Sequence, residues 1–379
     1  MLKNKRIAIV CRIADGLSGL SKMLLEYAAF FRDAGARLEV VAQRVDSEAF
    51  ERRGAVVRRL PGWPWGGYLR RRLFAGMADW LCGGERYDLV HGHGDCLSQD
   101  VLSLHNCVHA AHEAILGRPH PGSGAARLHE RLLAGGRFKL LIANSEMMKR
   151  ELISRFGLPE DKTMVIYPGY ERERFSPERR LAMRAACRRE LGLSEDELFI
   201  TLVTSGDFEK RGVPLFLQAL GRAASALPKP WRAAVVGKES KIGPYLSKAR
   251  AAGICDRVSF YPPVPEVERY YFAADLHVHP AHYEEFGITV LEAMACGLAV
   301  ISHARVGACE LMSGAARQGL LETLDAESLA GRIIELAGAP LARERAGQAA
   351  AQAARVHDWR RHCEGIAAVY ERVLGAKNR

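Results

Sequence analysis

Two glutamates in the segment HYEEFGITVLEAMACG, residues 282–297, have the type and surroundings of ligand-binding groups. Glu284 precedes Gly287, whereas Glu292 lies in an apolar run, where a carboxylate is costly unless it is hydrogen-bonded. Two hydroxyls of a ligand, such as those of a ribose, would satisfy it. The alternative is helix capping, for which an acidic side chain near the helix start suffices. The pattern predicts a helix that begins at Gly287 and ends at Gly297.

A pair of cations, Lys210 and Arg211, lies in the segment SGDFEKRG, residues 205–212, directly after a predicted strand. A helix-forming run follows, so both side chains are expected in a loop at the ligand-facing edge of a sheet. A diphosphate that departs during group transfer needs its growing negative charge met by a metal ion or by fixed cations. The alternative is a solvated pair on a loop. The position after the strand favours anion binding.

A third segment, SGLSK at residues 18–22, follows the first predicted strand and opens the first predicted helix. Gly19 lets the backbone approach a ligand, and the free N–H groups at a helix start attract anions. The alternative is a strand-to-helix turn that requires glycine. The segment is neither the Gly-x-Gly-x-x-Gly dinucleotide fingerprint nor a phosphate-binding loop with its lysine.

Histidines and cysteines gather in HGHGDC and HNCVHAAH, between residues 91 and 112. They offer metal-ligand chemistry, and the i, i+4 spacing of His105 and His109 would allow the two to share a helix face. No assembled spacing such as Cys-x-x-Cys or His-Glu-x-x-His is present. Histidines at strand ends also serve polar ligands, so both interpretations stay open. The cluster consists of His91, His93, Cys96, His105, Cys107, His109 and His112.

The elements that position these residues follow from apolar periodicity. Short apolar runs alternate with helical patterns, which indicates parallel sheets covered on both faces. A charged interval without strands, residues 170–197, joins two such series, and residues 357–374 have an amphipathic helical pattern. The sequence therefore predicts two doubly wound α/β domains, which bind ligands at the carboxyl ends of their strands. Strands are predicted at residues 6–13, 37–43, 87–93, 101–106, 139–145, 163–169, 198–206, 231–237, 258–263, 275–280 and 298–303.

The composition is that of a soluble globular protein, since the 379 residues are 48% hydrophobic and 26% charged. No apolar run approaches the roughly 20 residues of a membrane span, and no signal peptide is predicted. Nine cysteines without a paired spacing indicate reduced thiols in the cytosol. The net charge of +10 favours anionic partners, although no nucleic-acid-binding motif is present. The segment GWPWGGYLRRRLF, residues 62–74, is interpreted either as an exposed loop with a helix start or as a membrane-surface patch with three arginines on lipid phosphates.

Together these segments resemble the retaining GT-B glycosyltransferases of family four, in the same order along nearly the whole chain. SGLSK stands at the glycine-rich loop of that family, and LIANSEMMKREL is similar to its serine-bearing strand and helix. VIYPGYERERF resembles viyNGvd…F, with Pro168 in place of asparagine, and TSGDFEKRGVPLFLQAL resembles the Lys/Arg loop. EEFGITVLEAMACGLAVIS is similar to the most specific motif, E-x-F-G-l-x-x-l-E-A-m-A-x-G-x-P-V-i, with Ala299 in place of proline. Within the family, GDFEKRGV most resembles the lipopolysaccharide core glucosyltransferases.

The resemblance implies a role for each candidate residue. Glu292 would bind the ribose hydroxyls of a nucleotide, and Glu284 would hold hydroxyls of the donor sugar. Lys210 and Arg211 would bind the diphosphate in place of a metal ion, and His105 would approach the donor sugar near the transferring carbon. The implied catalytic set consists of His105, Lys210, Arg211 and Glu284. The implied donor-binding residues are Gly19, Gly206, Gly237, Val264, Phe286, Gly287, Ile288, Thr289 and Glu292.

The resemblance also implies the fold and the reaction. Residues 1–170 with 357–379 would form an acceptor-side Rossmann-like domain, to which the terminal helix crosses back. Residues 171–356 would form the nucleotide-sugar domain, facing it across a cleft. The enzyme would move a hexose from a nucleoside diphosphate sugar, with a UDP-sugar favoured. It would retain the anomeric configuration and need neither a metal nor another cofactor.

The implied acceptor is a glycan or glycolipid, such as a lipopolysaccharide core precursor. The protein is then expected in the cytoplasm, in peripheral contact with the anionic inner face of the cytoplasmic membrane and without a nucleic-acid partner. Two alternatives stay open. One is a sugar-nucleotide epimerase of the same fold, and the other is a metal hydrolase that uses the cluster at residues 91–112.

Overall fold

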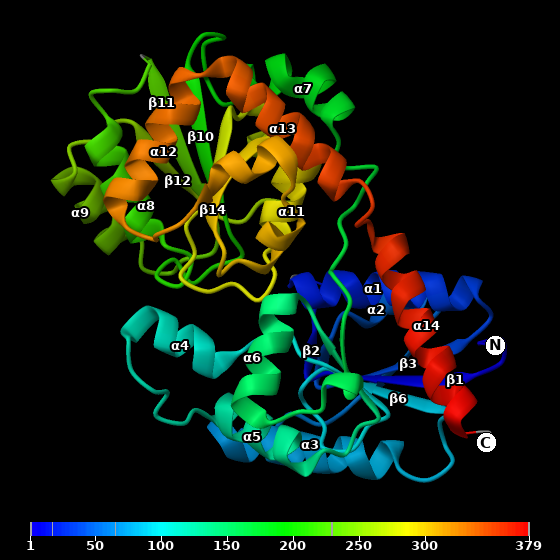
Figure 1. Cartoon of the computed structure of the whole chain (residues 1–379). Helices are drawn as coiled ribbons and strands as arrows, with labels where there is room; N and C mark the ends of the chain where they lie inside the picture. The colour runs from blue at the N-terminus through cyan, green and yellow to red at the C-terminus, as the bar shows by residue number, and fades with distance from the viewer. Residues whose placement is uncertain (1, 17, 65, 229, 378–379) are drawn as a thin grey trace. The chain divides into compact units, whose positions relative to one another are not determined.

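The computed structural model describes residues 2–16, 18–64, 66–228 and 230–377. By its internal contacts the chain divides into two compact units (Figure 1). Unit 1 comprises Met1–Gly169 and Trp359–Arg379, and unit 2 comprises Tyr170–Asp358. Each unit is built on a parallel sheet, with seven strands in unit 1 and six in unit 2. The prediction of two doubly wound α/β units is therefore confirmed.

Unit 1 has the strand order β5-β3-β1-β6-β7-β8-β9 and a small separate pair, β2 with β4. Helix α1 lies on one side of the sheet, and α3 and α5 lie on the other (Figure 1). The strands are β1 (Arg6–Val10), β2 (Ile13–Ala14), β3 (Arg37–Ala42), β4 (Arg44–Val45), β5 (Val56–Arg59), β6 (Leu89–Gly92), β7 (Val101–Ser103), β8 (Leu140–Ala143) and β9 (Thr163–Val165). The helices are α1 (Gly19–Asp33), α2 (Ser47–Arg52), α3 (Gly67–Cys82), α4 (Val108–Leu116), α5 (Gly124–Gly135), α6 (Glu146–Phe156) and α14 (Trp359–Lys377), with a 3-10 turn η1 (Glu160–Lys162).

The predicted terminal helix is α14, and it packs within unit 1 against α1. Its Tyr370 ring stacks on Phe31 at 5.0 Å between centroids, and its hydroxyl lies 2.7 Å from Nδ1 of His91. His362 of the same helix lies 2.9 Å from the hydroxyl of Tyr27. These buried contacts explain why the amphipathic pattern at the chain end belongs to the first unit.

Unit 2 has the strand order β12-β11-β10-β13-β14-β15. Helix α8 packs against α9 and α12, whereas α7 packs against α10 and α11 packs against α13. The strands are β10 (Leu198–Val203), β11 (Trp231–Val236), β12 (Val258–Tyr261), β13 (Leu276–His279), β14 (Ala299–His303) and β15 (Leu320–Leu321). The helices are α7 (Pro177–Glu190), α8 (Val213–Ala223), α9 (Gly243–Ala251), α10 (Glu268–Ala273), α11 (Ile288–Ala295), α12 (Ala326–Gly338) and α13 (Pro340–Ala354), with 3-10 turns η2 (Gly307–Leu311) and η3 (Gly314–Gly319).

The charged interval is more than a linker, because half of it forms α7 of unit 2. Arg188 of α7 is 3% exposed and donates to the carbonyl oxygens of Ala273 at 2.8 Å and Ser194 at 2.6 Å. Its Nη1 also lies 3.5 Å from a carboxylate oxygen of Asp275. Burial lowers the pKa of Arg188. An arginine of the charged interval thus supplies hydrogen bonds to the end of α10.

Replacing Arg188 with alanine is expected to destabilise the fold by about 3 kcal/mol, because buried carbonyl groups lose their donor and Asp275 loses a partner. Arg189→Ala is the matched control, since Arg189 is the next residue and is exposed. Urea denaturation of both variants measures the difference. A loss no larger than that of the control would contradict the structural role of Arg188.

None of the helices in the described part of the chain is both long and apolar enough to cross a membrane.

Candidate functional site

The glutamate-bearing segment connects β13 to α11 at the carboxyl edge of the unit 2 sheet. Gly287 immediately precedes α11 and has a φ of 94°, a left-handed conformation that favours glycine. A Cβ atom there would also lie 3.1 Å from Cγ1 of Val306. Gly297 follows the helix with a φ of 73°. The predicted helix bounds are confirmed.

The loop between β13 and α11, residues 280–287, is called the entry loop and contains Glu284 and Glu285. Neither of these glutamates caps the helix. No side chain hydrogen-bonds at the Gly287 cap, and the first turn of α11 contains no acidic residue. The backbone of Glu284 instead pairs with the segment after β14. Its N–H donates to Arg305 at 2.9 Å, and its carbonyl oxygen accepts from Gly307 at 3.0 Å. This pairing fixes the direction of the Glu284 side chain.

The loop between β10 and α8, residues 204–212, carries Lys210 and Arg211 and is called the cation loop. Two ion pairs join it to the entry loop. Nζ of Lys210 lies 3.0 Å and 3.3 Å from the two carboxylate oxygens of Glu285. Nη1 of Arg211 is paired with Glu284. All four side chains are at most 14% exposed, so the pairs lie in surroundings with little water. The structure therefore brings together three predicted catalytic residues and adds Glu285.

The cation loop is locked in place by its backbone. Asp207 has a φ of 55°, and its carboxylate accepts from the N–H of Lys210 at 3.1 Å. Gly212 has a φ of 71°, and a Cβ atom there would overlap the carbonyl group of Pro280. The N–H of His282 donates to the carbonyl oxygen of Lys210 at 3.0 Å. These contacts hold both cations against the entry loop.

Arg211 and His279 share Glu284. Burial lowers the pKa of Arg211, an effect opposed by Glu285 and Asp207. Nε2 of His279 lies 3.5 Å from Oε2 of Glu284, and burial followed by the charge of Arg211 lowers the pKa of His279 well below its usual value. His279 is therefore a neutral imidazole at pH 7, able to donate to a carboxylate or a ligand oxygen.

Glu292 lies in α11, 9% exposed, with its Oε2 3.1 Å from the hydroxyl of Tyr271. The same hydroxyl lies 3.2 Å from the carbonyl oxygen of Thr289. Burial first, and then the Glu292 charge, raises the pKa of Tyr271. Tyr271 therefore stays protonated and can donate to the carboxylate. The expectation that buried Glu292 must be hydrogen-bonded is met partly by the protein itself.

The other donor-binding candidates of unit 2 lie near the same sheet edge. Gly206 follows β10, and a Cβ atom there would lie 2.9 Å from the carbonyl oxygen of Lys238. Gly237 follows β11, where a Cβ atom would lie 2.7 Å from the carbonyl oxygen of Thr204. Close packing of the two loops thus already requires both glycines. The remaining candidates are the half-buried Val264, the buried Phe286, and Ile288 and Thr289 in the first turn of α11.

In unit 1, His105 follows β7, with Nε2 2.8 Å from Nδ1 of His93 and Nδ1 3.3 Å from the side-chain nitrogen of Asn144. It lies before α4, so it does not share a helix face with His109, as their spacing would have allowed. His109 instead lies 2.8 Å from a carboxylate oxygen of Glu130. The loop ahead of α4 separates the two rings, which the spacing alone did not show.

The histidine and cysteine cluster is a network of polar contacts. His91 is fully buried between the hydroxyls of Tyr370, at 2.7 Å, and Ser103, at 2.8 Å. The thiol of Cys96 is 2.8 Å from Gln99, and burial raises its pKa. Among the described residues, no three or more His, Cys, Asp or Glu side chains are grouped to hold a metal ion.

Gly19 is the exposed first residue of α1. Ser18 before it accepts from the N–H of Ser21 at 3.1 Å and caps the helix. The hydroxyls of the two serines lie 3.0 Å apart. The turn interpretation and the ligand interpretation of SGLSK are both compatible with this geometry.

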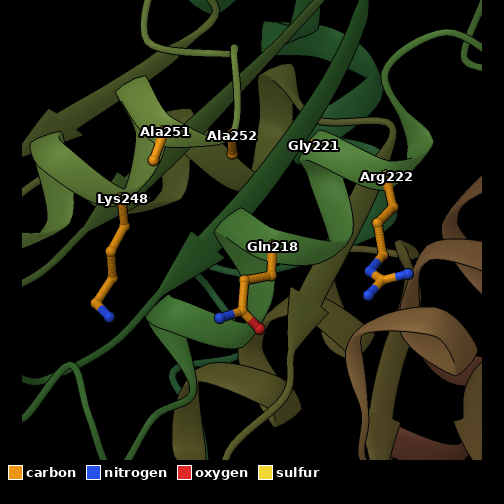
Figure 2. A pocket seen from close by; sticks show the side chains of 6 residues that line it. All are labelled: Gln218, Gly221, Arg222, Lys248, Ala251 and Ala252. Carbon is orange, nitrogen blue, oxygen red and sulfur yellow. The ribbon is translucent and has the colours of Figure 1, made fainter.

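A separate cavity of about 400 Å³ lies between α8 and α9 of unit 2 (Figure 2). The two helices approach closely at Gly221, where a Cβ atom would lie 2.9 Å from that of Ala252. None of the predicted site residues lines this cavity. Its lining consists of Gln218, Gly221, Arg222, Lys248, Ala251 and Ala252.

Two family models match this chain and together cover most of it. The model for glycosyl transferases group 1 matches residues 183–353. The model for glycosyltransferase family 4 matches residues 17–174. The matched ranges correspond to most of unit 2 and most of unit 1, respectively.

Curated relatives include D-inositol 3-phosphate glycosyltransferases. That of Acidothermus cellulolyticus is 30% identical over 77% of this chain and 68% of its own length. That of Geodermatophilus obscurus is 28% identical over 94% of this chain and 85% of its own length.

Solved structures of similar fold include WaaG, a glycosyltransferase involved in lipopolysaccharide biosynthesis. It has a TM-score of 0.81 and 20% identity over 96% of this chain and 99% of its own. Anabaena Alr3699/HepE in complex with UDP-glucose has a TM-score of 0.74 and 20% identity over 97% of this chain and 99% of its own.

Proposed function

Because this chain belongs to glycosyltransferase family 4 and has the GT-B fold, we propose that it transfers a hexose from a nucleoside diphosphate sugar to a glycan or glycolipid. The observation that carries the proposal is the pairing of Lys210 and Arg211 with Glu285 and Glu284 at the carboxyl edge of the unit 2 sheet. Two nearly buried cations held by a rigid loop are suited to the charge of a departing diphosphate.

The donor is bound through unit 2 in this proposal. The diphosphate displaces the carboxylates from Lys210 and Arg211, which frees Glu284 to accept from sugar hydroxyls. Glu292 accepts from the ribose while Tyr271 keeps its carboxylate oriented. The N–H groups at the start of α11 face the phosphates, where a helix N-terminus favours negative charge. A UDP-sugar is the favoured donor, since HepE of similar fold was solved with UDP-glucose.

We further propose that transfer retains the anomeric configuration, with His105 at the donor sugar, and needs no metal ion. The two cations supply the positive charge that a metal supplies elsewhere. A sugar-nucleotide epimerase would change the sugar without an acceptor. NMR of the product and of the donor separates transfer with retention from epimerisation.

Activity with a UDP-hexose is therefore expected to survive excess EDTA unchanged, because Lys210 and Arg211 already neutralise the diphosphate. The measurement is UDP release with and without the chelator. Complete loss that a divalent ion restores would contradict metal independence while leaving the transferase function intact.

The acceptor is proposed to be a lipopolysaccharide-core type of glycolipid, reached at the cytoplasmic face of the membrane. WaaG, which shares the fold, is involved in lipopolysaccharide biosynthesis. The outer side of α3 offers a contact surface, where Leu69 is 50% exposed and Trp80 is 78% exposed, with exposed Arg72 between them. Aromatic and cationic side chains together suit a lipid headgroup layer. Trp65 of the same segment lies outside the described residues.

Arg72→Ser with Trp80→Ser is expected to lower binding to anionic vesicles at least about tenfold, since an arginine near such a surface contributes about 1 kcal/mol and the indole adds apolar contact. Leu181→Ser with Arg189→Ser removes an exposed apolar and cationic pair from unit 2 and serves as the control. Co-sedimentation at low and high salt measures the effect, because surface attraction weakens with salt. Equal loss in both double variants would remove α3 from the proposal.

A further inference from the structure

The three arginines of α3 do not share one environment. Arg72 is exposed, whereas Arg70 and Arg71 are half-buried. Both inward arginines lie one turn before the fully buried Phe74, on the same side of the helix. The three arginines are therefore not one exposed cationic surface, as the membrane-patch interpretation supposed. Arg70 and Arg71 turn toward the body of unit 1.

One of these inward arginines, Arg71, contacts Asp95 in the loop that follows β6. Oδ1 of Asp95 lies 3.4 Å from Nη1 of Arg71, and Oδ2 accepts from the backbone N–H of Arg12 at 2.9 Å. Asp95 is 15% exposed. Burial raises its pKa, whereas the Arg12 N–H and the charges of Arg71 and Arg12 oppose that shift. Asp95 thus ties the loop after β1 to the start of α3.

Positive charge exceeds negative charge in this cluster. Arg12 has Arg71, Arg70 and Arg44 as cationic neighbours, and together with burial they lower its pKa against the opposing effect of Asp95. Arg44 is paired with Asp15 at 2.7 Å. Four guanidinium groups therefore stand against two carboxylates, since Asp15 and Asp95 are the acidic groups that contact them in the described part of the chain.

Some of these donors are also unused. The Nε atoms of Arg12 and Arg70 are buried without a hydrogen-bond partner in the part of the chain that the structure describes. An unpartnered buried donor on a charged group costs free energy, and so does the approach of like charges. A bound anion would relieve both costs.

The cluster occupies a ligand-binding position of its sheet. Arg12 follows β1 and Asp95 follows β6, and these two strands are neighbours in the parallel sheet. Doubly wound sheets bind ligands beyond the carboxyl ends of such strands. The candidate diphosphate cations Lys210 and Arg211 belong to the other unit.

We propose that Arg12, Arg70 and Arg71 form a subsite in unit 1 for the phosphoryl group of a phosphorylated acceptor, with Asp95 positioning Arg71 and the backbone of Arg12. Planar guanidinium groups match phosphate oxygens with paired hydrogen bonds. The inference rests on the proposed transferase function only in identifying the phosphorylated ligand as the acceptor, because anion binding itself can be measured without turnover.

The test measures how strongly added phosphate stabilises the full chain against thermal unfolding. The midpoint of thermal unfolding is recorded in a buffer that contains no other phosphate, with UDP present to occupy the donor site. Inorganic phosphate is the probe. Arg12→Gln and Arg71→Gln are each expected to weaken the apparent phosphate affinity about tenfold or more, because each removes charge-assisted hydrogen bonds. Arg72→Gln is the matched control, with the same charge change on the exposed side of α3, and should leave phosphate affinity unchanged.

Stabilisation by UDP in each variant shows that it is folded. Equal phosphate affinity in wild type, Arg71→Gln and Arg72→Gln, or no phosphate effect on wild type, would overturn the subsite. If the glutamine variants lose UDP stabilisation, Arg71→Lys decides, because it keeps the charge without the planar geometry. Weaker phosphate binding in Arg71→Lys supports the subsite, and unchanged binding refutes it.

Vesicles of phosphatidic acid identify the source of the phosphoryl group. Weaker vesicle binding by Arg71→Gln than by Arg189→Gln, which removes an exposed arginine of unit 2, assigns the subsite to a lipid headgroup. Vesicle binding that Arg71→Gln leaves unchanged, with phosphate affinity lost, assigns it to a soluble phosphate ester. UDP-hexose hydrolysis, measured in parallel on the wild type, tests the proposed function separately.

Discussion

Arg211→Ala is expected to lower kcat about a thousandfold, the effect of removing one preorganised donor from a developing oxyanion. Arg211 is 13% exposed and locked between Asp207 and Gly212 in a rigid loop. Charge at such a position needs no reorganisation when the diphosphate leaves. Its loss should therefore act on the transition state more than on donor binding, so that KM changes less than kcat.

Arg211→Lys separates charge from geometry, because lysine keeps the cation but lacks the planar guanidinium. We expect kcat between those of Arg211→Ala and wild type. Arg222→Ala, an exposed arginine of α8 in the same unit, is the charge-matched control and should retain wild-type kcat. Steady-state kinetics with a UDP-hexose gives all three values. A fall of less than about tenfold in a folded Arg211→Ala variant would exclude Arg211 from leaving-group stabilisation.

Local sequence patterns predicted the main strands because short, continuous apolar runs such as RIAIV and LFITLV are typical of buried strands in a parallel sheet. Strand β5 was missed because its sequence VVRR is short, largely exposed and at the edge of the sheet, where little apolar surface is buried. The helix from Gly287 was predictable since left-handed glycines mark both of its ends.

The partners of the site residues were less accessible to sequence reasoning. Lys210 and Glu285 are far apart along the chain and meet because the loops after β10 and β13 lie at one edge of the sheet. Tyr271 and Glu292 belong to the helices before and after β13, α10 and α11, and meet through the packing of these helices. His279 ends an apolar strand, where nothing local distinguishes a site residue from a core histidine. A search for polar residues at the end of each predicted strand and in the loop after it would have found His279 and Glu285, but not which residue each one contacts.

Glu292→Ala and Glu284→Ala are expected to impair the enzyme in different ways. Glu292 shares its carboxylate with Tyr271 and is proposed to bind ribose, which is present in every nucleotide-bound state. Its removal should weaken binding of free UDP about tenfold to a hundredfold, the loss of one or two charge-assisted hydrogen bonds. Calorimetric titration with UDP measures this directly.

Glu284→Ala should leave UDP affinity unchanged or slightly improved, because Arg211 loses its competing carboxylate and remains available to the diphosphate. Turnover should nevertheless fall at least about a hundredfold, since the sugar loses its partner and the reacting carbon loses its position. Glu310→Ala serves as the control, an acidic residue of the neighbouring 3-10 turn η2. Equal loss of UDP affinity in both variants would contradict the separate roles. Loss of the cooperative unfolding transition in both would instead assign the glutamates to stability, because unpaired Arg211 and Tyr271 then suffice to disrupt the edge of the sheet.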